Sequence, residues 1–180
     1  SGRLDRHEPA RFHTLSGLLT AERRGDAIEL DFPATPDEPA AAPDGLDEIL
    51  GARVVNFRSS RFDHLAELES EAIVRGLRPD FARLKSLPVR GIMVTSRAAS
   101  PGFDFVSRFF GPAVGIDEDP VTGSAHCCLG PYWSRRLGKT EMTAYQASRR
   151  GGVVGVTVMG DRVRLRGRAV TVMAAKLIAG

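Results

Sequence analysis

The sequence predicts a mixed α+β fold in which many antiparallel strands surround a few helices. Short runs of alternating or β-branched residues, separated by Gly-containing turns, fill both ends of the chain, as in residues 152–167. One longer helical pattern, residues 122–137, ends at Gly138, the residue type that favours a helix C-terminus. With 180 residues, the chain is long enough to bury a substantial core.

The chain begins with a predicted three-stranded meander over residues 11–32, with turns at Ser16-Gly17 and Gly25-Asp26. Residues 33–43 carry four prolines, and this composition predicts an extended linker or crossover rather than a packed element. Three short strands are too few to bury a core of their own. We therefore expect residues 1–32 either to pack onto the rest of the chain or to begin partway through a larger domain.

A second block of helices and strands is predicted from residue 45 onward. In order, the patterns predict a helix at 45–52, strands at 53–58 and 64–69, helices at 70–77 and 79–87, strands at 89–96 and 103–110, an acidic loop, the helix at 122–137, and strands at 141–148, 152–160, 162–167 and 169–177. Gly-rich turns between the last four strands favour antiparallel pairing there.

Composition and charge exclude several classes of protein. The chain is 42% hydrophobic and 26% charged, and it lacks both an apolar run of membrane-spanning length and an N-terminal signal pattern, so we expect a cytoplasmic protein that does not bind membranes. The net charge is +3, and Arg162, Arg164, Arg166 and Arg168 alternate along one predicted strand face. No aromatic residues interleave with them, so this pattern favours a solvated strand face over a nucleic-acid footprint.

The two cysteines, Cys127 and Cys128, are adjacent within the predicted helix at 122–137. A disulfide between neighbouring helical residues would be badly strained, and the chain has no CxxC or His/Cys spacing of a zinc site. We expect both to behave as small buried hydrophobic residues, and we expect no bound metal.

The stretch "GIDEDPVTGSAH", residues 115–126, contains the predicted N-terminal end of the helix at 122–137. Pro120 disfavours helical geometry at the residue before it, so the helix begins later, with Thr122 or Ser124 as its N-cap. Free backbone N–H groups around Gly123 and Ser124 would then point out of the helix end, where they and the helix dipole attract an anion such as a substrate carboxylate.

Three acidic residues, Asp117, Glu118 and Asp119, precede this helix end. In a functional interpretation, Asp119 could move a proton on the bound anion. In the alternative, the acids complement the helix dipole and have no chemical role. His126 lies one turn into the helix, where packing or hydrogen bonding is the commoner role of a lone histidine.

Several segments together resemble the PhzF-like phenazine-biosynthesis family, which shares the diaminopimelate epimerase fold. They are "FDFVSRFFGPAVGIDEDPVTGSAH", "PYWSRRLGK", "AYQASRRGG", "DRVRLRGRAVTVMAAKL" and, upstream, "FHTLSGLLTAERRGDAIELDFPA". The resemblance implies an α+β fold of two lobes, each with β-strands around a central helix. Residues 1–34 would end the first lobe, with 166–180 returning to it. Residues 35–43 would be a linker and residues 44–165 a complete second lobe.

The resemblance also implies the chemistry. Family members act without a cofactor by shuttling protons on small carboxylic acids, and they often form homodimers. Carried over by motif, Asp119 is the catalytic aspartate, and Gly123 and Ser124, with Thr122 beside them, bind substrate at the helix end. Arg108 in "VSRFF" is a further candidate for steadying a carboxylate, and a structural salt bridge is its alternative role.

One part of the family pattern is missing. The acid/base glutamate that the resemblance implies, near a "GNP"-type turn and ahead of an "HPT"-type motif, has no counterpart here, and Glu8 lacks the surrounding pattern. We therefore expect an N-terminally shortened family member with little activity by itself, because isomerisation usually needs a proton donor and an acceptor. The rival interpretation is a non-catalytic module that binds a small carboxylate or mediates dimerisation.

Overall fold

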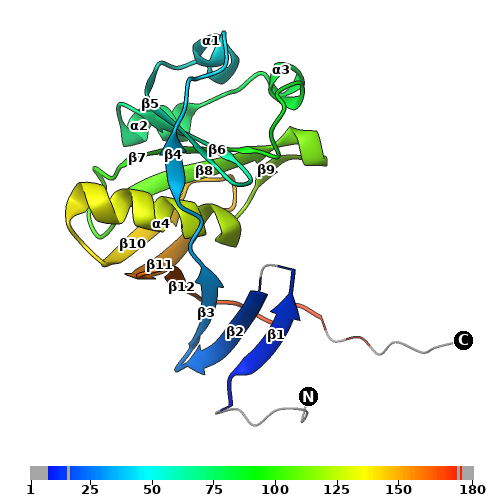
Figure 1. Ribbon diagram of the computed structural model, residues 1–180, viewed down its shortest axis with the longest axis vertical. Coiled ribbons are helices and arrows are strands. Elements are labelled where there is room, and N and C mark those ends of the chain that lie inside the picture. The colour runs from blue at the N-terminus through cyan, green and yellow to red at the C-terminus, as the bar shows by residue number, and fades with distance from the viewer. Residues whose placement is uncertain (1–7, 16, 174, 176–180) are drawn as a thin grey trace, which may run out of the picture.

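The computed structural model describes residues 8–15, 17–173 and 175. In chain order its elements are β1 (Ala10–Thr14), β2 (Gly17–Arg24), β3 (Ala27–Pro33), β4 (Asp37–Pro39), α1 (Leu46–Leu50), β5 (Val54–Ser60), β6 (His64–Leu68), α2 (Glu71–Gly76), α3 (Phe81–Lys85), β7 (Ile92–Arg97), β8 (Phe105–Gly111), the short helix η1 (Pro112–Val114), β9 (Ile116–Asp119), α4 (Gly123–Leu137), β10 (Glu141–Gln146), β11 (Gly152–Met159) and β12 (Arg162–Gly167) (Figure 1). Every helix and strand predicted between residues 11 and 167 is confirmed, with ends that shift by a few residues.

One continuous sheet organises the described residues. Its strand order is β1-β2-β3-β12-β11-β10-β8-β7-β6-β5-β4, and β9 pairs with β8 beside this path. Most pairs are antiparallel, but β6 pairs with β7 and β8 pairs with β10 in parallel. The mixed α+β class predicted from the sequence is therefore confirmed. The lobe boundaries predicted above stay predictions, since the same sheet runs through both parts.

The sheet curls around α4, so that α4 is the central helix of the larger part of the molecule (Figure 1). Leu65 of β6, Phe105 of β8 and Leu165 of β12 lie far apart in the sequence, yet they share one core with the buried side of α4. The helices α1, α2 and α3 cover the other face of the sheet. Successive residues of β8 serve the two sides in turn, because Val106 and Phe110 belong to this second core.

The meander β1–β3 extends away from the rest of the molecule and joins it through β12 (Figure 1). Arginines of β12 pair with carboxylates of β3. The Nε of Arg162 lies 2.8 Å from Asp31, and Nη1 of Arg164 lies 3.9 Å from Glu29. These partly exposed ion pairs agree with the solvated strand face expected from the arginine pattern.

A proline inside α4 attaches the expected linker to the helix. Pro131 has no backbone N–H, so it cannot donate to the carbonyl of Cys127 one turn earlier. The backbone N–H of Thr35 donates to this carbonyl instead, at 3.0 Å. A buried acceptor that the helix leaves free is thereby satisfied by the chain segment that crosses it.

The expectation that residues 33–43 are not a packed element is wrong. Within this segment, Asp37–Pro39 form β4, which pairs with β5. Asp37 is buried and accepts hydrogen bonds from two guanidinium groups, those of Arg58 in β5 and Arg135 in α4. Prolines and charges predict an exposed connection when they are considered alone, but here distant arginines make burial of the acid favourable.

Two further expectations are corrected. The acidic stretch is partly a strand, because Ile116–Asp119 form β9, which pairs with Phe109 and Gly111 of β8, beyond the residues of β8 that pair with β10. The strand predicted over 169–177 is not found in its described part, where residues 168–173 have no strand partner and Val172 is 91% exposed. Residues 174, 176 and 177 lie outside the described residues.

Candidate functional site

The N-terminal end of α4 is the centre of the candidate site. Thr122 stands at the N-cap position, but its side chain makes no capping hydrogen bond, and no described residue accepts a hydrogen bond from the backbone N–H groups of Gly123, Ser124 or Ala125. At its other end the helix stops at Gly138, which adopts the left-handed conformation expected from the sequence. The open N-terminus therefore presents free donors and the positive end of the helix dipole.

The hydroxyl of Thr122 is turned toward the candidate acid. Its Oγ1 donates to Oδ2 of Asp119 at 2.5 Å, so the residue that would cap the helix instead orients the carboxylate. Asp119 is partly buried and ends β9, directly before Pro120. The structure thus brings Asp119, Thr122, Gly123 and Ser124, all predicted from one short motif, to the same helix end.

Gln146, at the end of β10, holds this turn in place. Its side chain is fully buried, and its Oε1 accepts from the N–H of Thr122 at 2.8 Å. Its Nε2 donates to the carbonyl of Asp119 at 2.7 Å and to Oγ1 of Thr122 at 3.1 Å. The neighbouring Ser148 donates to the carbonyl of Pro120 at 2.8 Å. Two residues of a separate strand and loop therefore fix the chain between Asp119 and Thr122.

Strand alternation separates the three acids. Asp119 pairs with Phe109 of β8, whose side chain belongs to the core around α4. Glu118 faces the opposite side of the sheet and forms a two-bond ion pair with Arg108, at 2.6 and 3.0 Å. Asp117 is exposed.

Arg108 is fully engaged away from the helix end. Besides its bonds to Glu118, its Nη1 donates to the carbonyl of Leu77 at 2.8 Å, just after α2. Its side chain is only 11% exposed. These contacts favour the structural salt bridge, which the sequence left as the alternative role of Arg108, over contact with a substrate.

His126, Cys127 and Cys128 lie inside the molecule. Burial lowers the pKa of His126, although its Nδ1 lies 2.8 Å from the carbonyl of Thr122. Donation from Nδ1 to this carbonyl leaves Nε2 as the unprotonated nitrogen, and Nε2 has no partner among the described residues. Burial raises the pKa of both thiols to about 12, so they remain protonated and act as core residues, as expected.

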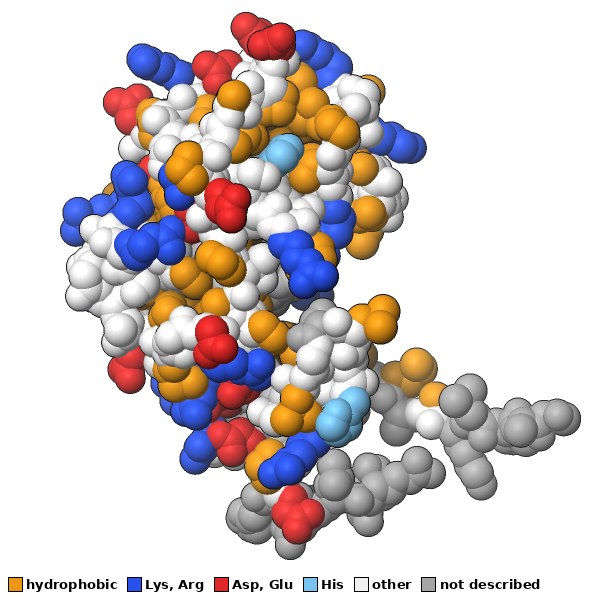
Figure 2. Space-filling view, viewed as in Figure 1, with side chains coloured by type: hydrophobic (Ala, Val, Ile, Leu, Met, Phe, Trp, Pro, Cys, Tyr) orange, Lys and Arg blue, Asp and Glu red, His pale blue; other side chains and the backbone are white. Residues whose placement is uncertain are grey.

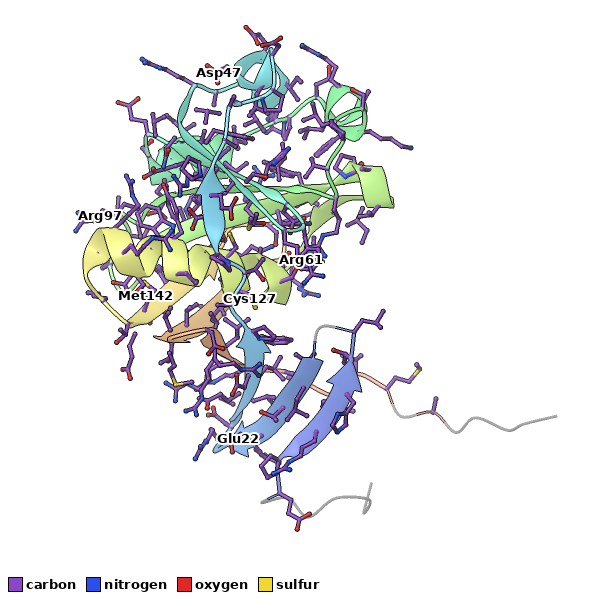
Figure 3. The ribbon with its side chains drawn as sticks, viewed as in Figure 1. Glu22, Asp47, Arg61, Arg97, Cys127 and Met142 are labelled. Carbon is purple, nitrogen blue, oxygen red and sulfur yellow. The ribbon has the colours of Figure 1, made fainter. Side chains whose placement is uncertain are left out.

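Two residues next to Ser124 were not singled out from the sequence. The Nη2 of Arg90 donates to Oγ of Ser124 at 3.1 Å, and Asp63 holds the same guanidinium through two hydrogen bonds. Figure 3 labels Arg61, from the turn that also contains Asp63, beside the N-terminal end of α4. In the sequence, Arg90 stands out only as an arginine before Gly91 at the start of a buried strand. Nothing in the neighbouring residues links it to Ser124.

The surface around the site is hollowed on one side. Figure 2 shows a notch in the molecular outline between the β1–β3 part and the rest of the molecule. A separate depression of about 340 Å³ is lined by Glu118, Pro120, Ser148, Arg149 and Arg150, and it lies on the Glu118 side of β9. Among the described residues, no group of three or more His, Cys, Asp or Glu side chains could hold a metal ion, and no helix is long and apolar enough to span a membrane.

The chain matches a known protein family over most of its length. Residues 4–175 match the family described as phenazine biosynthesis-like protein, PhzC-PhzF. A protein of Halalkalibacterium halodurans named as an uncharacterized isomerase is 49% identical over 95% of this chain, and the match covers 65% of that relative, so the chain spans about two thirds of its length. A crystal structure of a PhzF family protein from Enterococcus faecalis superposes with a TM-score of 0.83 at 37% identity, covering 89% of this chain and 61% of that one.

A more distant solved structure places the fold in a wider group. A hydroxyproline epimerase from Agrobacterium vitis has a TM-score of 0.51 at 12% identity, covering 92% of this chain and 57% of that one. At this identity the likeness concerns the fold alone. The diaminopimelate epimerase-like fold expected from the resemblance is confirmed.

Proposed function

Because this chain belongs to the phenazine biosynthesis-like (PhzC-PhzF) family, we propose that it carries the proton-transfer site of an isomerase or epimerase that acts on a small carboxylic acid without a cofactor. A carboxylate held next to an open helix end, with its position fixed by neighbouring residues, is the observation that carries this proposal. The N–H donors of Gly123 and Ser124 and the proposed base Asp119 lie within six consecutive residues, so one ligand could contact both.

In this proposal the helix end binds the substrate carboxylate. The N–H groups of Gly123 and Ser124 and the hydroxyl of Ser124 donate to its oxygens, and the helix dipole favours its charge. As charge moves onto the carboxylate when the neighbouring C–H loses its proton, these fixed donors stabilise it more strongly. The proton goes to Asp119, which Thr122 orients through a single hydrogen bond.

The number of acids decides which reaction is possible. If Asp119 takes a proton and returns it to another carbon on the same face, one acid is enough for isomerisation. An epimerisation returns the proton to the opposite face, and this needs a second acid facing Asp119 across the substrate. We expect the 180-residue chain alone to perform the epimerisation slowly or not at all.

We expect the site to work within a homodimer. A chain that stays monomeric at every concentration in sedimentation equilibrium would contradict that expectation.

Solvent proton exchange tests the catalytic assignment. The chain is incubated in D₂O with a panel of small carboxylic acids that carry an acidic C–H, and deuterium incorporation is followed by NMR. Asp119→Asn should slow exchange by at least about 100-fold, the usual contribution of a positioned acid or base. Asp117→Asn removes an exposed carboxylate from the same strand and should leave the rate unchanged.

Two outcomes would overturn the proposal. Exchange that persists in Asp119→Asn would show that another group moves the proton. Binding of a carboxylate at the helix end without exchange in any variant would favour a module that binds small carboxylates and performs no chemistry.

A further inference from the structure

The backbone at Arg90 is held close to β8 by the residue that follows it. The next residue, Gly91, lies so close to this strand that an added Cβ would come 2.8 Å from the carbonyl oxygen of Phe110 and would overlap the ring of Phe109. Any other residue at position 91 would therefore push the segment away from β8. Glycine allows the close approach that puts Arg90 next to the helix end.

The guanidinium of Arg90 is held on several sides. Its Nε donates to Oδ1 of Asp63 at 2.8 Å, and its Nη2 donates to Oδ2 of the same carboxylate. Asp63 is only 2% exposed. The guanidinium carbon lies 5.3 Å from the ring centre of Phe62 and 5.9 Å from that of Phe109. A planar group with two bonds to a buried acid and aromatic rings nearby loses little further freedom when it binds something else.

The same group fixes what the Ser124 hydroxyl can do. Because Oγ of Ser124 accepts a hydrogen bond from Nη2 of Arg90 at 3.1 Å, the proton of this hydroxyl must point toward a different acceptor. No described residue supplies that acceptor, and Ser124 is exposed. Nη1 of Arg90 also has no acceptor among the described residues, and its side chain is 39% exposed. The Ser124 hydroxyl, Nη1 of Arg90 and the backbone N–H groups at the start of α4 are thus all free to donate to one ligand, and the nearby Asp119 is the proposed base.

We propose that Arg90 is a positioning residue that determines specificity for a carboxylate at the helix end, by directing the hydroxyl proton of Ser124 toward the ligand. This inference rests on the proposed function, because it concerns the same site. Asp63 balances the charge of Arg90, so the selectivity comes mainly from the direction of the donors and not from free positive charge. A ligand that presents an amide NH₂ in place of one carboxylate oxygen would set a donor against these donors.

The neighbouring Arg61 supplies the contrast. It lies in the same turn as Asp63, with its guanidinium carbon 5.1 Å from the ring of Phe62, and no hydrogen bond joins it to Ser124. If Arg90 acted only through its positive charge, substituting either arginine would lower the preference for a carboxylate to a similar extent. If Arg90 acts by orienting the Ser124 hydroxyl, only its own substitution should lower that preference.

Binding of benzoate and benzamide, which differ in this one group, tests the proposal. Dissociation constants are measured by NMR titration of the full chain, following the backbone amide signals of residues 123–125. The wild-type chain should prefer benzoate by at least about tenfold, because a site of donors leaves groups unpaired with the wrong partner. Arg90→Gln should lower this ratio by at least about threefold, since the backbone N–H groups and the helix dipole still favour the carboxylate, and Arg61→Gln should leave it unchanged.

The linked variants separate orientation from folding. Arg90→Lys keeps the charge without the two-bond geometry and should lower the ratio to a similar extent; it replaces Arg90→Gln if that variant does not fold. Adding Ser124→Ala to Arg90→Gln should cause no further loss, because the two residues act as one unit. A ratio that stays within twofold of wild type in Arg90→Gln or Arg90→Lys overturns the proposal, as does a wild-type chain without preference.

The two proposals can fail independently. The role of Arg90 is tested by the binding ratio in Arg90→Gln, and the catalytic assignment by proton exchange in Asp119→Asn. Loss of proton exchange in that variant together with an unchanged ratio in Arg90→Gln would retain the catalytic assignment and reject the role of Arg90.

Discussion

Replacing Gln146 by methionine tests how the candidate acid is held in place. Methionine has nearly the same length and shape, but it lacks the amide that makes three hydrogen bonds to Asp119 and Thr122. The N–H of Thr122 would remain buried without a partner, which costs about 1–3 kcal/mol, and each of the two other lost bonds costs about 1 kcal/mol. We expect Gln146→Met to lower the free energy of unfolding by about 3 kcal/mol, a loss that an ordinary domain can survive.

Urea denaturation measures this loss directly. Trp133 is the single tryptophan of the chain and is buried in α4, so its fluorescence reports on the helix that starts at the site. Glu141→Gln, at an exposed position of the same strand, is the control and should change stability by less than about 0.5 kcal/mol. If Gln146→Met is as stable as this control, the three hydrogen bonds do not hold the turn.

A second substitution adds a dependence on pH. Gln146→Glu keeps an acceptor for the N–H of Thr122, but its carboxylate would face the carbonyl of Asp119 in a buried position. Burial and the facing carbonyl oxygen both disfavour the charged form, so they raise the pKa of the new carboxyl above its value in the unfolded chain. The variant should therefore be most stable, relative to wild type, below the unfolded pKa, and it should lose stability as pH rises through the folded pKa. A difference from wild type that does not change with pH would contradict this.

Two further predictions concern residues outside the site. Burial acts to raise the pKa of Glu71, but hydrogen bonds from Ser100 and its other partners lower it from 4.5 to about 2. At about 1.4 kcal/mol per pKa unit, the ionised side chain contributes about 3 kcal/mol to the free energy of unfolding. This contribution is present above pH 4.5 and is lost as pH falls toward 2. In urea unfolding at several pH values, the stability difference between wild type and Glu71→Gln should shrink over this window, and a constant difference would disprove the assignment. An added Cβ at Gly130 of α4 would lie 2.8 Å from Cγ1 of the buried Val156, so Gly130→Ala should destabilise by about 1–3 kcal/mol even though alanine favours helices. Gly76→Ala in α2, where an added Cβ meets nothing within 4 Å, should be neutral or stabilising, and urea unfolding of both variants measures the difference; equal effects of the two substitutions would contradict a role of packing against Val156.

Local patterns were enough to predict the long elements. The alternation in residues 152–159 and the left-handed glycine after α4 are visible within a few neighbouring residues, and both are found where they were predicted. The short strands β4 and β9 were missed because their formation depends on partners elsewhere. The burial of Asp37, for example, depends on arginines 21 and 98 residues away.

The same distinction applies to the site. Asp119, Thr122, Gly123 and Ser124 belong to one contiguous motif, so the sequence could place them together. Gln146 and Arg90 reach the motif from 27 and 34 residues away, and no periodicity predicts such contacts. Arg108 shows the opposite problem, since an arginine for a substrate and an arginine for Glu118 look the same in a sequence.

The short strand β9 gives the acidic stretch an unusual vulnerability. Glu118 and Asp119 are chemically similar neighbours, and only their place in the pairing with β8, which has an irregularity between Phe109 and Gly111, assigns one to Arg108 and the other to the helix end. Removing or adding one residue in the preceding turn would exchange the sides on which the two carboxylates project. An added residue would put Glu118, a longer acid, in the place of the proposed base and Asp117, a shorter acid, opposite Arg108, although every residue named in the site would still be present.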